Sequence, residues 1–168
     1  MSLLMTAKTA IRLSLGGANL ALVFFVLCGA AFAGDQYVDR EGRPVGGYDV
    51  VTYHTETEPL MGDPEITAEY NGVTWYFANP ANRDRFLENP QRYVPAYDGH
   101  CAWAAANGDK ARTDPLAYRV VDDVLYMNFN RRIQRRWEQD IPGFLEQSEA
   151  NWPDIEDEPA ASPRSGWF

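Results

Sequence analysis

The stretch Ile66-Thr-Ala-Glu-Tyr-Asn-Gly-Val-Thr-Trp-Tyr-Phe77 is the clearest structural signal in this 168-residue chain. Two runs rich in β-branched and aromatic residues flank Asn71-Gly72. Asn-Gly readily adopts the positive φ angles that a type I′ turn needs, so the stretch predicts a β-hairpin. Asn79-Pro80 follows immediately and predicts a helix over residues 80–89, because Asn is a good N-cap and Pro suits the first helical position.

A similar order of elements follows later in the chain. Residues 118–121 and 124–129 are rich in β-branched and aromatic residues, and Asp122-Asp123 between them predicts a second hairpin. Residues 131–150 predict a helix that Pro142 kinks or splits. Its helical spacing is carried by five apolar residues: Ile133, Trp137, Ile141, Phe144 and Leu145. Beyond the two hairpins, the sequence shows no internal repeat.

Three further segments complete the predicted fold. Residues 34–46 are predicted to be a lead-in loop, and the β-branched and aromatic residues 48–54 to be a short strand or extended segment. Residues 154–168 are acidic and Pro-rich, and we expect this tail to be disordered. Hairpins and short helices in this order predict a small single α+β domain over residues 47–153, with the hairpins packed against short helices and a longer C-terminal helix.

Residues 97–108, YDGHCAWAAANG, hold one of the two histidines and one of the two cysteines of the chain. Asp98 is predicted to be the N-cap of a helix that Gly108 ends. Cys101 would then lie in the first helical turn, where the helix dipole and free backbone N–H groups lower the pKa of a thiol. The alternative is a buried cysteine that packs as a small hydrophobic residue.

The first 33 residues have the layout of a secretory signal peptide. Lys8 and Arg12 precede an apolar run that ends at Ala31-Phe32-Ala33, a small-x-small cleavage pattern. The apolar core is about 10 residues long, short of the ~20 that a membrane span needs. We therefore expect cleavage before Gly34 rather than a retained anchor. The mature protein is then exported, periplasmic or secreted, with no membrane attachment.

Removal of the signal peptide leaves an acidic chain with one thiol. The full chain has a net charge of −9, and without Lys8 and Arg12 it has 13 basic and 24 acidic residues, a net charge of −11. This charge makes nucleic acids and anionic membrane surfaces poor partners. Cys28 leaves with the signal peptide. An unpaired Cys101 in an oxidising compartment indicates a reactive thiol, a metal ligand, an intermolecular bridge or simple burial.

Few residues can carry chemistry, because the sequence has no Gly-rich phosphate loop, no CxxC pair and no dense run of metal ligands. Cys101 is the first candidate. His100 and His54 would complete a two-His, one-Cys set suited to copper or zinc. Adjacent helical residues do not face each other, so His100 and Cys101 bind one metal only if the turn is irregular.

Four arginines, on the other hand, are expected to form a solvated face or to pair with the acidic tail. They lie early in the predicted helix, where positive charge is mildly unfavourable. These residues are Arg131, Arg132, Arg135 and Arg136.

Seven motifs resemble the YHS domain family in the order in which they occur. Gly47-Tyr-Asp-Val-Val-Thr-Tyr53, Tyr70-Asn-Gly-Val-Thr-Trp-Tyr-Phe77, Arg83-Asp-Arg-Phe-Leu-Glu-Asn-Pro90 and Arg92-Tyr-Val-Pro95 resemble the family in general. The other three, Gly99-His-Cys-Ala-Trp103, Leu125-Tyr-Met-Asn-Phe-Asn130 and Asn151-Trp-Pro153, resemble an exported bacterial branch, the YHS domain-containing (seleno)proteins. The resemblance covers residues 46–153. It implies a small metal-associated α+β fold, related to modules of heavy-metal and copper transport proteins.

The resemblance also limits where metal can bind. Ordinary YHS modules carry cysteines at places that here hold Val51 or Thr52, Ala78 and Asn82. Because these thiol ligands are absent, the resemblance implies metal binding or redox work only through Cys101, with His100 beside it.

Three functions follow from these residues. The first expectation is a non-enzymatic module that binds a soft metal, copper or zinc, through Cys101, His100 and His54, with a metal-transport or redox protein as partner. The second is a single-cysteine redox protein, which requires an accessible thiol with a lowered pKa. The third is a non-catalytic interaction domain in which Cys101 belongs to the core.

Overall fold

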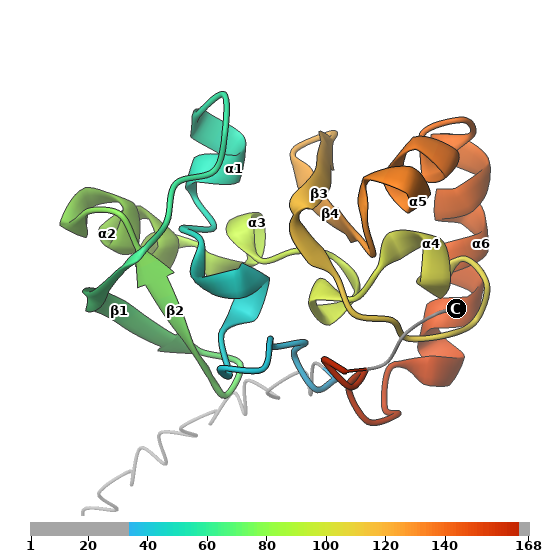
Figure 1. The fold of residues 1–168 in the computed structure, drawn as a ribbon, viewed down its shortest axis with the longest axis horizontal. Helices are drawn as coiled ribbons and strands as arrows, with labels where there is room; N and C mark the ends of the chain where they lie inside the picture. Colours follow the sequence, from blue (N-terminus) through green and yellow to red (C-terminus); the bar gives the residue numbers. More distant parts are fainter. Residues whose placement is uncertain (1–33, 165–168) are drawn as a thin grey trace, which may run out of the picture. The chain divides into compact units, whose positions relative to one another are not determined.

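A computed structural model describes residues 34–164, and these residues build two antiparallel β-hairpins surrounded by short helices (Figure 1). They belong to one compact unit that spans Phe32–Phe168. The α+β class predicted from the sequence is confirmed. The predicted signal peptide lies outside the described residues, as do residues 165–168. Within the described range, no helix is long and apolar enough to cross a membrane.

The first half of the domain, residues 44–93, contains the hairpin predicted from Asn71-Gly72. Strands β1 (Asp63–Tyr70) and β2 (Val73–Phe77) pair antiparallel, and helix α2 (Pro80–Glu88) follows. The Asn79 side chain caps α2 by accepting a hydrogen bond from the backbone N–H of Asn82 at 2.9 Å. The remaining elements are the 3₁₀ turn η1 (Pro44–Gly47), α1 (Thr52–Thr55) and α3 (Pro90–Tyr93).

The strand predicted over residues 48–54 was wrong, because most of this segment is a turn and the helix α1. The reversal starts at Asp49, whose Oδ1 accepts a hydrogen bond from the Val51 N–H while its backbone carbonyl accepts one from the Thr52 N–H. Side-chain bonds of this kind compete with extended structure. The β-branched composition instead reflects burial, since Val50 and Val51 have no exposed surface.

The second half, residues 97–155, contains the second predicted hairpin. Strands β3 (Asp114–Val121) and β4 (Val124–Asn128) pair antiparallel. The predicted helix over 131–150 is two helices, α5 (Arg131–Trp137) and α6 (Ile141–Ile155). Pro142 lies in the first turn of α6 rather than at a kink, and Asp140 caps that helix. The 3₁₀ turn η2 (Tyr97–Gly99) and α4 (Ala102–Ala105) precede the hairpin.

The two halves are a structural repeat, whereas the sequence had indicated no repeat beyond the two hairpins. β3 begins 51 residues after β1, and β4 begins 51 residues after β2. The corresponding strands of the two halves have equal lengths, eight residues for β1 and β3 and five for β2 and β4. Each hairpin is irregular at the same place, after Asp63 and after Asp114. Asn130 caps α5 through the Ile133 N–H at 2.9 Å, as Asn79 caps α2. The conserved feature is therefore a turn, a hairpin and an Asn-capped helix.

The repeat extends to the turns that precede the hairpins. Three successive residues with positive φ occur in each half, Val45–Gly47 in η1 and Tyr97–Gly99 in η2, here 52 residues apart. A non-glycine residue rarely adopts positive φ. Two such runs of three consecutive residues at corresponding places therefore mark the same backbone path.

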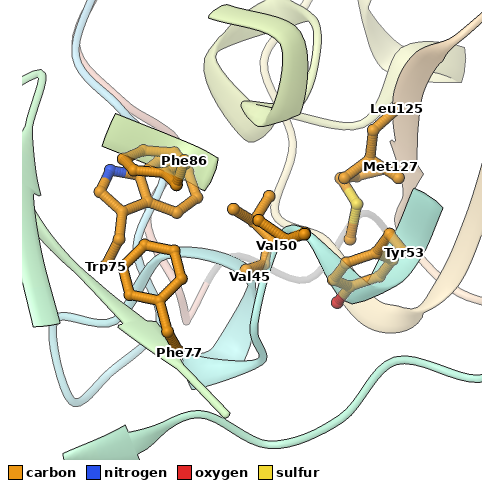
Figure 2. Packing of buried hydrophobic residues seen from close by; sticks show 9 residues of the cluster. Val45, Val50, Tyr53, Trp75, Phe77, Phe86, Leu125 and Met127 are labelled. Carbon is orange, nitrogen blue, oxygen red and sulfur yellow. The ribbon is translucent and has the colours of Figure 1, made fainter. Parts of the chain in front are cut away.

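The hairpins differ in how they are buried. In β2, Trp75 and Phe77 face the core and pack on Phe86 of α2, with ring centroids 5.5 and 5.1 Å away (Figure 2). In β4, Leu125 and Met127 belong to this same core (Figure 2). The opposite side of β4 packs on its own helix, because the Tyr126 ring lies 5.5 Å from that of Trp137. β4 is thus covered on both faces and joins the two halves.

The C-terminal residues are attached to the domain. Helix α6 reaches Ile155, which is buried, and lies beside α4 (Figure 1). The Lys110 ammonium donates hydrogen bonds to the backbone carbonyls of Glu156 and Glu158 at 2.7 and 2.6 Å. The expectation of a disordered tail is therefore corrected for residues 154–161. The sequence pattern missed these bonds because the tail's backbone, not its side chains, makes them.

Candidate functional site

Asp98 does not cap a helix, contrary to the sequence prediction. It lies inside η2 with φ 50°, and helix α4 begins only at Ala102, so that Cys101 occupies the N-cap position. The cause is the left-handed turn at Tyr97 and Asp98, since an N-cap needs extended backbone angles. Asp98 instead uses its backbone carbonyl, which accepts hydrogen bonds from Gln36 Nε2 at 2.7 Å and from the Tyr37 N–H at 2.8 Å.

The Cys101 thiol is buried, with 1% of the residue exposed. Its sulfur accepts a hydrogen bond from the Phe129 N–H at 3.2 Å and lies 3.9 Å from Asn128 Oδ1. Burial raises the pKa of the thiol, while the backbone N–H groups of Ala104, Phe129 and Trp103 act in the opposite direction. The net effect favours a protonated, inert thiol rather than the activated one predicted from a helix start.

The repeat identifies what Cys101 replaces. In the first half, the corresponding residue is Asp49. The backbone N–H of Asp49 donates to the Leu60 carbonyl at 2.8 Å, and that of Cys101 donates to the Ala111 carbonyl at 3.0 Å. In each half, the backbone N–H of the residue that follows the second strand of the hairpin donates a hydrogen bond to the side chain of Asp49 or Cys101. Ala78 donates to Asp49 Oδ2 at 2.8 Å, as Phe129 does to the Cys101 sulfur. The thiol therefore fills a structural position.

His100 is fully buried, and both of its ring nitrogens are occupied by backbone groups. Nδ1 lies 2.9 Å from the Tyr97 carbonyl, and Nε2 accepts a hydrogen bond from the Ala161 N–H at 3.1 Å. A carbonyl only accepts, so Nδ1 carries the proton and Nε2 the lone pair. Burial lowers the pKa of His100 to about 4, which keeps the ring neutral. His100 thus attaches the C-terminal residues to η2.

His54 lies in a different environment. It belongs to α1, its side chain is 4% exposed, and its Nδ1 is 3.6 Å from Asp123 Oδ1 in the turn of the second hairpin. Burial lowers the pKa of this imidazole, and Asp123 raises it. Neither ring nitrogen has a hydrogen-bond partner. His54 and His100 share none of these contacts.

The predicted set of Cys101, His100 and His54 is therefore not assembled as a metal site. Among residues 34–164, no three His, Cys, Asp or Glu side chains are grouped so that they could hold a metal ion. The hydrogen bonding of the His100 imidazole also argues against a metal at this place. The lone pair of His100 Nε2, the one that a metal would use, already accepts the Ala161 N–H.

The sequence did not indicate a cleft that opens between α1, β3 and α5. It measures about 490 Å³ and is lined by Tyr53, Thr57, Glu58, Tyr118, Arg119, Val120, Arg131 and Gln134. A smaller hollow of about 210 Å³ shares Glu58, Tyr118 and Arg131 with it. The lining comes from segments far apart in the sequence, so only the tertiary structure brings it together.

The walls of the cleft are held by side chains that bond to strand β3. The Tyr53 hydroxyl donates to the Pro115 carbonyl at 3.0 Å, and Gln134 Nε2 donates to the Tyr118 carbonyl at 2.7 Å. The rings of Tyr53 and Tyr118 pack edge to face, 4.7 Å apart. These contacts occupy the outer edge of β3, so the cleft suits a small molecule better than an added peptide strand.

Two guanidinium groups, those of Arg119 and Arg131, border the cleft, and Glu58 is the only acidic residue of its lining. Arg131 is exposed and lies at the first position of α5, where a positive charge is unfavourable to the helix. Its counterpart in the first half is Pro80, which favours a helix start. Arg119 also pairs with Glu138 at 3.9 Å, whereas the Arg131 guanidinium donates to the neutral Gln134 side chain at 3.4 Å. Arg131 is therefore the charge of this cleft that an anionic ligand would use first.

Comparison with known protein families gave no matching family model, and neither the curated proteins nor the solved structures gave a match.

Proposed function

We propose that this protein is an exported, non-catalytic binding domain that takes a small organic anion in the cleft between α1, β3 and α5. The observation that carries the proposal is the pair of arginines, Arg119 and Arg131, beside the partly exposed Tyr118 ring, which packs on the buried Tyr53 ring. Guanidinium groups pair with carboxylates in a planar, bidentate geometry, and tyrosine rings offer apolar area beside them. A carboxylate on a flat apolar body is the ligand that fits this combination.

In this proposal Cys101 and His100 are structural. The thiol accepts a backbone N–H in the core, and the imidazole connects η2 to the C-terminal residues. This corresponds to the interaction-domain alternative among the functions expected from the sequence. Membership of the YHS family, which rests on the motif resemblance, is part of the same proposal, and the metal association that it implies stays a prediction.

Soft-metal binding and thiol redox chemistry stay predictions. Copper or zinc binding through Cys101 and His100 would require the sulfur to leave its pocket and Nε2 to release the Ala161 N–H. Redox work would require oxidant to reach a residue that is 1% exposed. Titration of the mature domain with Cu(I) and Zn(II) tests the first, since protection of the Cys101 thiol by the metal, together with metal binding that Cys101→Ser abolishes, would establish a metal-handling function instead.

The anion proposal is tested by NMR titration of the mature domain with benzoate as the probe. We expect saturable shifts at Tyr53, Tyr118 and Gln134, and Arg131→Gln should weaken binding about tenfold or more, since a charge-assisted pair is lost. Arg135→Gln is the matched control, because Arg135 is exposed on the same helix but does not line the cleft. Its affinity should stay within twofold of the parent.

Inorganic phosphate serves as the second probe. Phosphate that binds as tightly as benzoate would show that only the charge is recognised, and it would overturn the assignment of an aromatic or apolar body to the ligand. Benzoate that shifts no cleft residue, or that responds equally to both arginine substitutions, would overturn the proposal itself.

A further inference from the structure

The carboxylate of Asp98 has no counter-ion among the described residues. Its Oδ2 is buried and without a hydrogen-bond partner. The positive charge of Lys110 lowers the pKa of Asp98, but the Lys110 ammonium donates its hydrogen bonds to the carbonyls of Glu156 and Glu158. Asp98 as a whole is partly buried, and the neutral Gly34 N–H is the donor that acts on its carboxyl. A carboxylate oxygen removed from water without an opposite charge is costly, so its retention calls for an explanation.

The backbone conformation of Asp98 is a second sign that its carboxylate has a role at this position. Asp98 has φ 50°, and the corresponding residue of the first half is Gly46, with φ 66°. Glycine adopts this conformation at little cost, whereas aspartate is strained there. The carboxylate is therefore kept at a position where the fold itself would favour glycine.

Gly34 lies directly against this carboxylate. A Cβ added to Gly34 would lie 2.8 Å from Asp98 Oδ2, and it would collide with the Glu156 carbonyl oxygen. The Gly34 N–H also acts on Asp98, where it lowers the pKa of a carboxyl that burial and the charge of Glu156 raise to about 6. Asp35 adds further negative charge near the same place.

We propose that the free α-ammonium group of Gly34, created by removal of the signal peptide, is the counter-ion of Asp98. The inference rests on the export part of the proposed function. Hydrolysis of the Ala33–Gly34 peptide bond by a signal peptidase adds water and gives the Ala33 carboxylate and the Gly34 amine, which is protonated at neutral pH. The acidic side chains Asp98, Glu156 and Asp35 outnumber the single cation Lys110 at this place. The Glu156 carbonyl, which already accepts from Lys110, has a second lone pair for the new terminus.

Processing would thus complete the fold at η2. The peptide N–H of the unprocessed chain offers one neutral donor at this place, whereas the ammonium offers three donors and a full charge. The segment that follows is already attached, since Gln36 and Tyr37 bond to the Asp98 carbonyl. The new terminus needs no rearrangement to reach the carboxylate.

The experiment compares four versions of the chain Gly34–Phe168, released from a fusion by cleavage immediately before Gly34. They combine a free or acetylated α-amine with Asp98 or Asp98→Asn. Acetylation removes the charge and adds little volume. With Asp98 in place, we expect acetylation to raise the unfolding equilibrium constant roughly tenfold, since the pair is partly buried. With Asp98→Asn, the change should be less than twofold.

Two further chains keep the test decisive. Asp35→Asn is the matched control, because Asp35 is exposed and its loss should leave the effect of acetylation within twofold. A chain that retains Ala33 should be as unstable as the acetylated one. Equal stability of the free, acetylated and Ala33-extended chains would overturn the ion pair. Export is judged separately, from the mass of the chain recovered after secretion, so a failure of export does not imitate a failure of the pair.

Discussion

The two halves of this domain share a backbone plan but fill one position with different chemistry. Asp49 in the first half accepts three hydrogen bonds, from the N–H groups of Val51 and Ala78 and from Asn82 Nδ2. In the second half, the Cys101 sulfur accepts a hydrogen bond from the Phe129 N–H and donates a weak one to Asn128 Oδ1, beside the apolar Ile133 that corresponds to Asn82. A polar network and an apolar pocket close the same junction.

The difference teaches what the lone thiol does in this fold. A backbone N–H that points inward after the second strand needs an acceptor, whichever half it belongs to. A carboxylate meets that need when a buried amide supports it, and a thiol meets it in apolar surroundings. The reactive interpretation of Cys101 came from its being the lone thiol and from a predicted helix start, whereas its position in the repeat indicates packing.

Removing the two side chains should give the largest contrast between the halves. Asp49→Ala leaves three buried donors without an acceptor, so we expect a loss of about 3–5 kcal/mol in the free energy of unfolding. Cys101→Ala deprives one donor and removes a small apolar group, and should cost about 1–2 kcal/mol. Urea denaturation of the mature domain at pH 7 measures both. Equal losses would show that the two sites are not organised differently.

Acid should weaken the second half through His100. The unfolded imidazole binds a proton near pH 6.5, whereas the folded pKa is about 4, so the unfolded state binds more protons between these values. Stability is therefore full above pH 6.5 and falls as the pH drops toward 4, by about 2–3 kcal/mol.

His100→Gln isolates this effect, because Gln does not titrate and its oxygen can accept the Ala161 N–H. The stability of this variant should change less between pH 7 and 4.5 than that of the parent. Tyr48, the counterpart of His100, provides the control in the first half, since Tyr48→Phe should leave the pH dependence as it is. A parent and a His100→Gln variant with the same pH profile would contradict the assignment.

The two Asn caps should be worth the same. Asn79→Ala and Asn130→Ala each remove an acceptor at 2.9 Å from a helical N–H, and each should cost about 1 kcal/mol. Because the caps lie on different helices, the double substitution should cost the sum. If one of the two substitutions left the free energy of unfolding unchanged, α2 and α5 would be equivalent in geometry but not in the stability that their caps provide.

The hairpin turns should give the smallest effect. The first turn has Gly72 at φ 74°, and the second has Asp123 at φ 65°. Asp123→Gly relieves this conformation but gives up the exposed contact with Arg92 and the contact with the buried His54, so we expect the two effects to offset to within about 0.5 kcal/mol. Gly72→Asp gains no such contacts and should lose about 0.5 kcal/mol. Thermal unfolding of the pair checks this, and a clear loss in Asp123→Gly would mean that the contacts with Arg92 and His54 outweigh the strain.

Local sequence chemistry predicted the elements whose cause is local. Asn71-Gly72 and Asp122-Asp123 set the hairpins, and Asn79 set the start of α2, because turn angles and caps depend on a few neighbouring residues. The strand predicted over residues 48–54 was wrong because the apolar residues of this segment are buried in a turn and a helix instead of pairing in a strand. Asp98 failed as a cap because a left-handed turn at Tyr97 and Asp98 delays the helix, a turn that the dipeptide Asp98-Gly99 itself favours.

The candidate sites depended far more on long-range contacts. Cys101 and His100 were found from composition, but their burial comes from Phe129 and Ala161, which lie far along the chain. The cleft was not found at all, since Tyr53, Tyr118 and Arg131 are brought together by packing alone. The repeat was also hidden, because few side chains coincide between the halves while the turns and hydrogen bonds do.

The sequence by itself therefore determined the two hairpins with their turns, the starts of α2 and α5 and the α+β class, because each follows from backbone preferences over a few residues. Only the tertiary structure decided that the two halves share one plan, that the thiol is a core acceptor and that the arginines border a cleft. The physical reason is that burial and hydrogen-bond partners are properties of packed surfaces, which residues distant in the chain supply together.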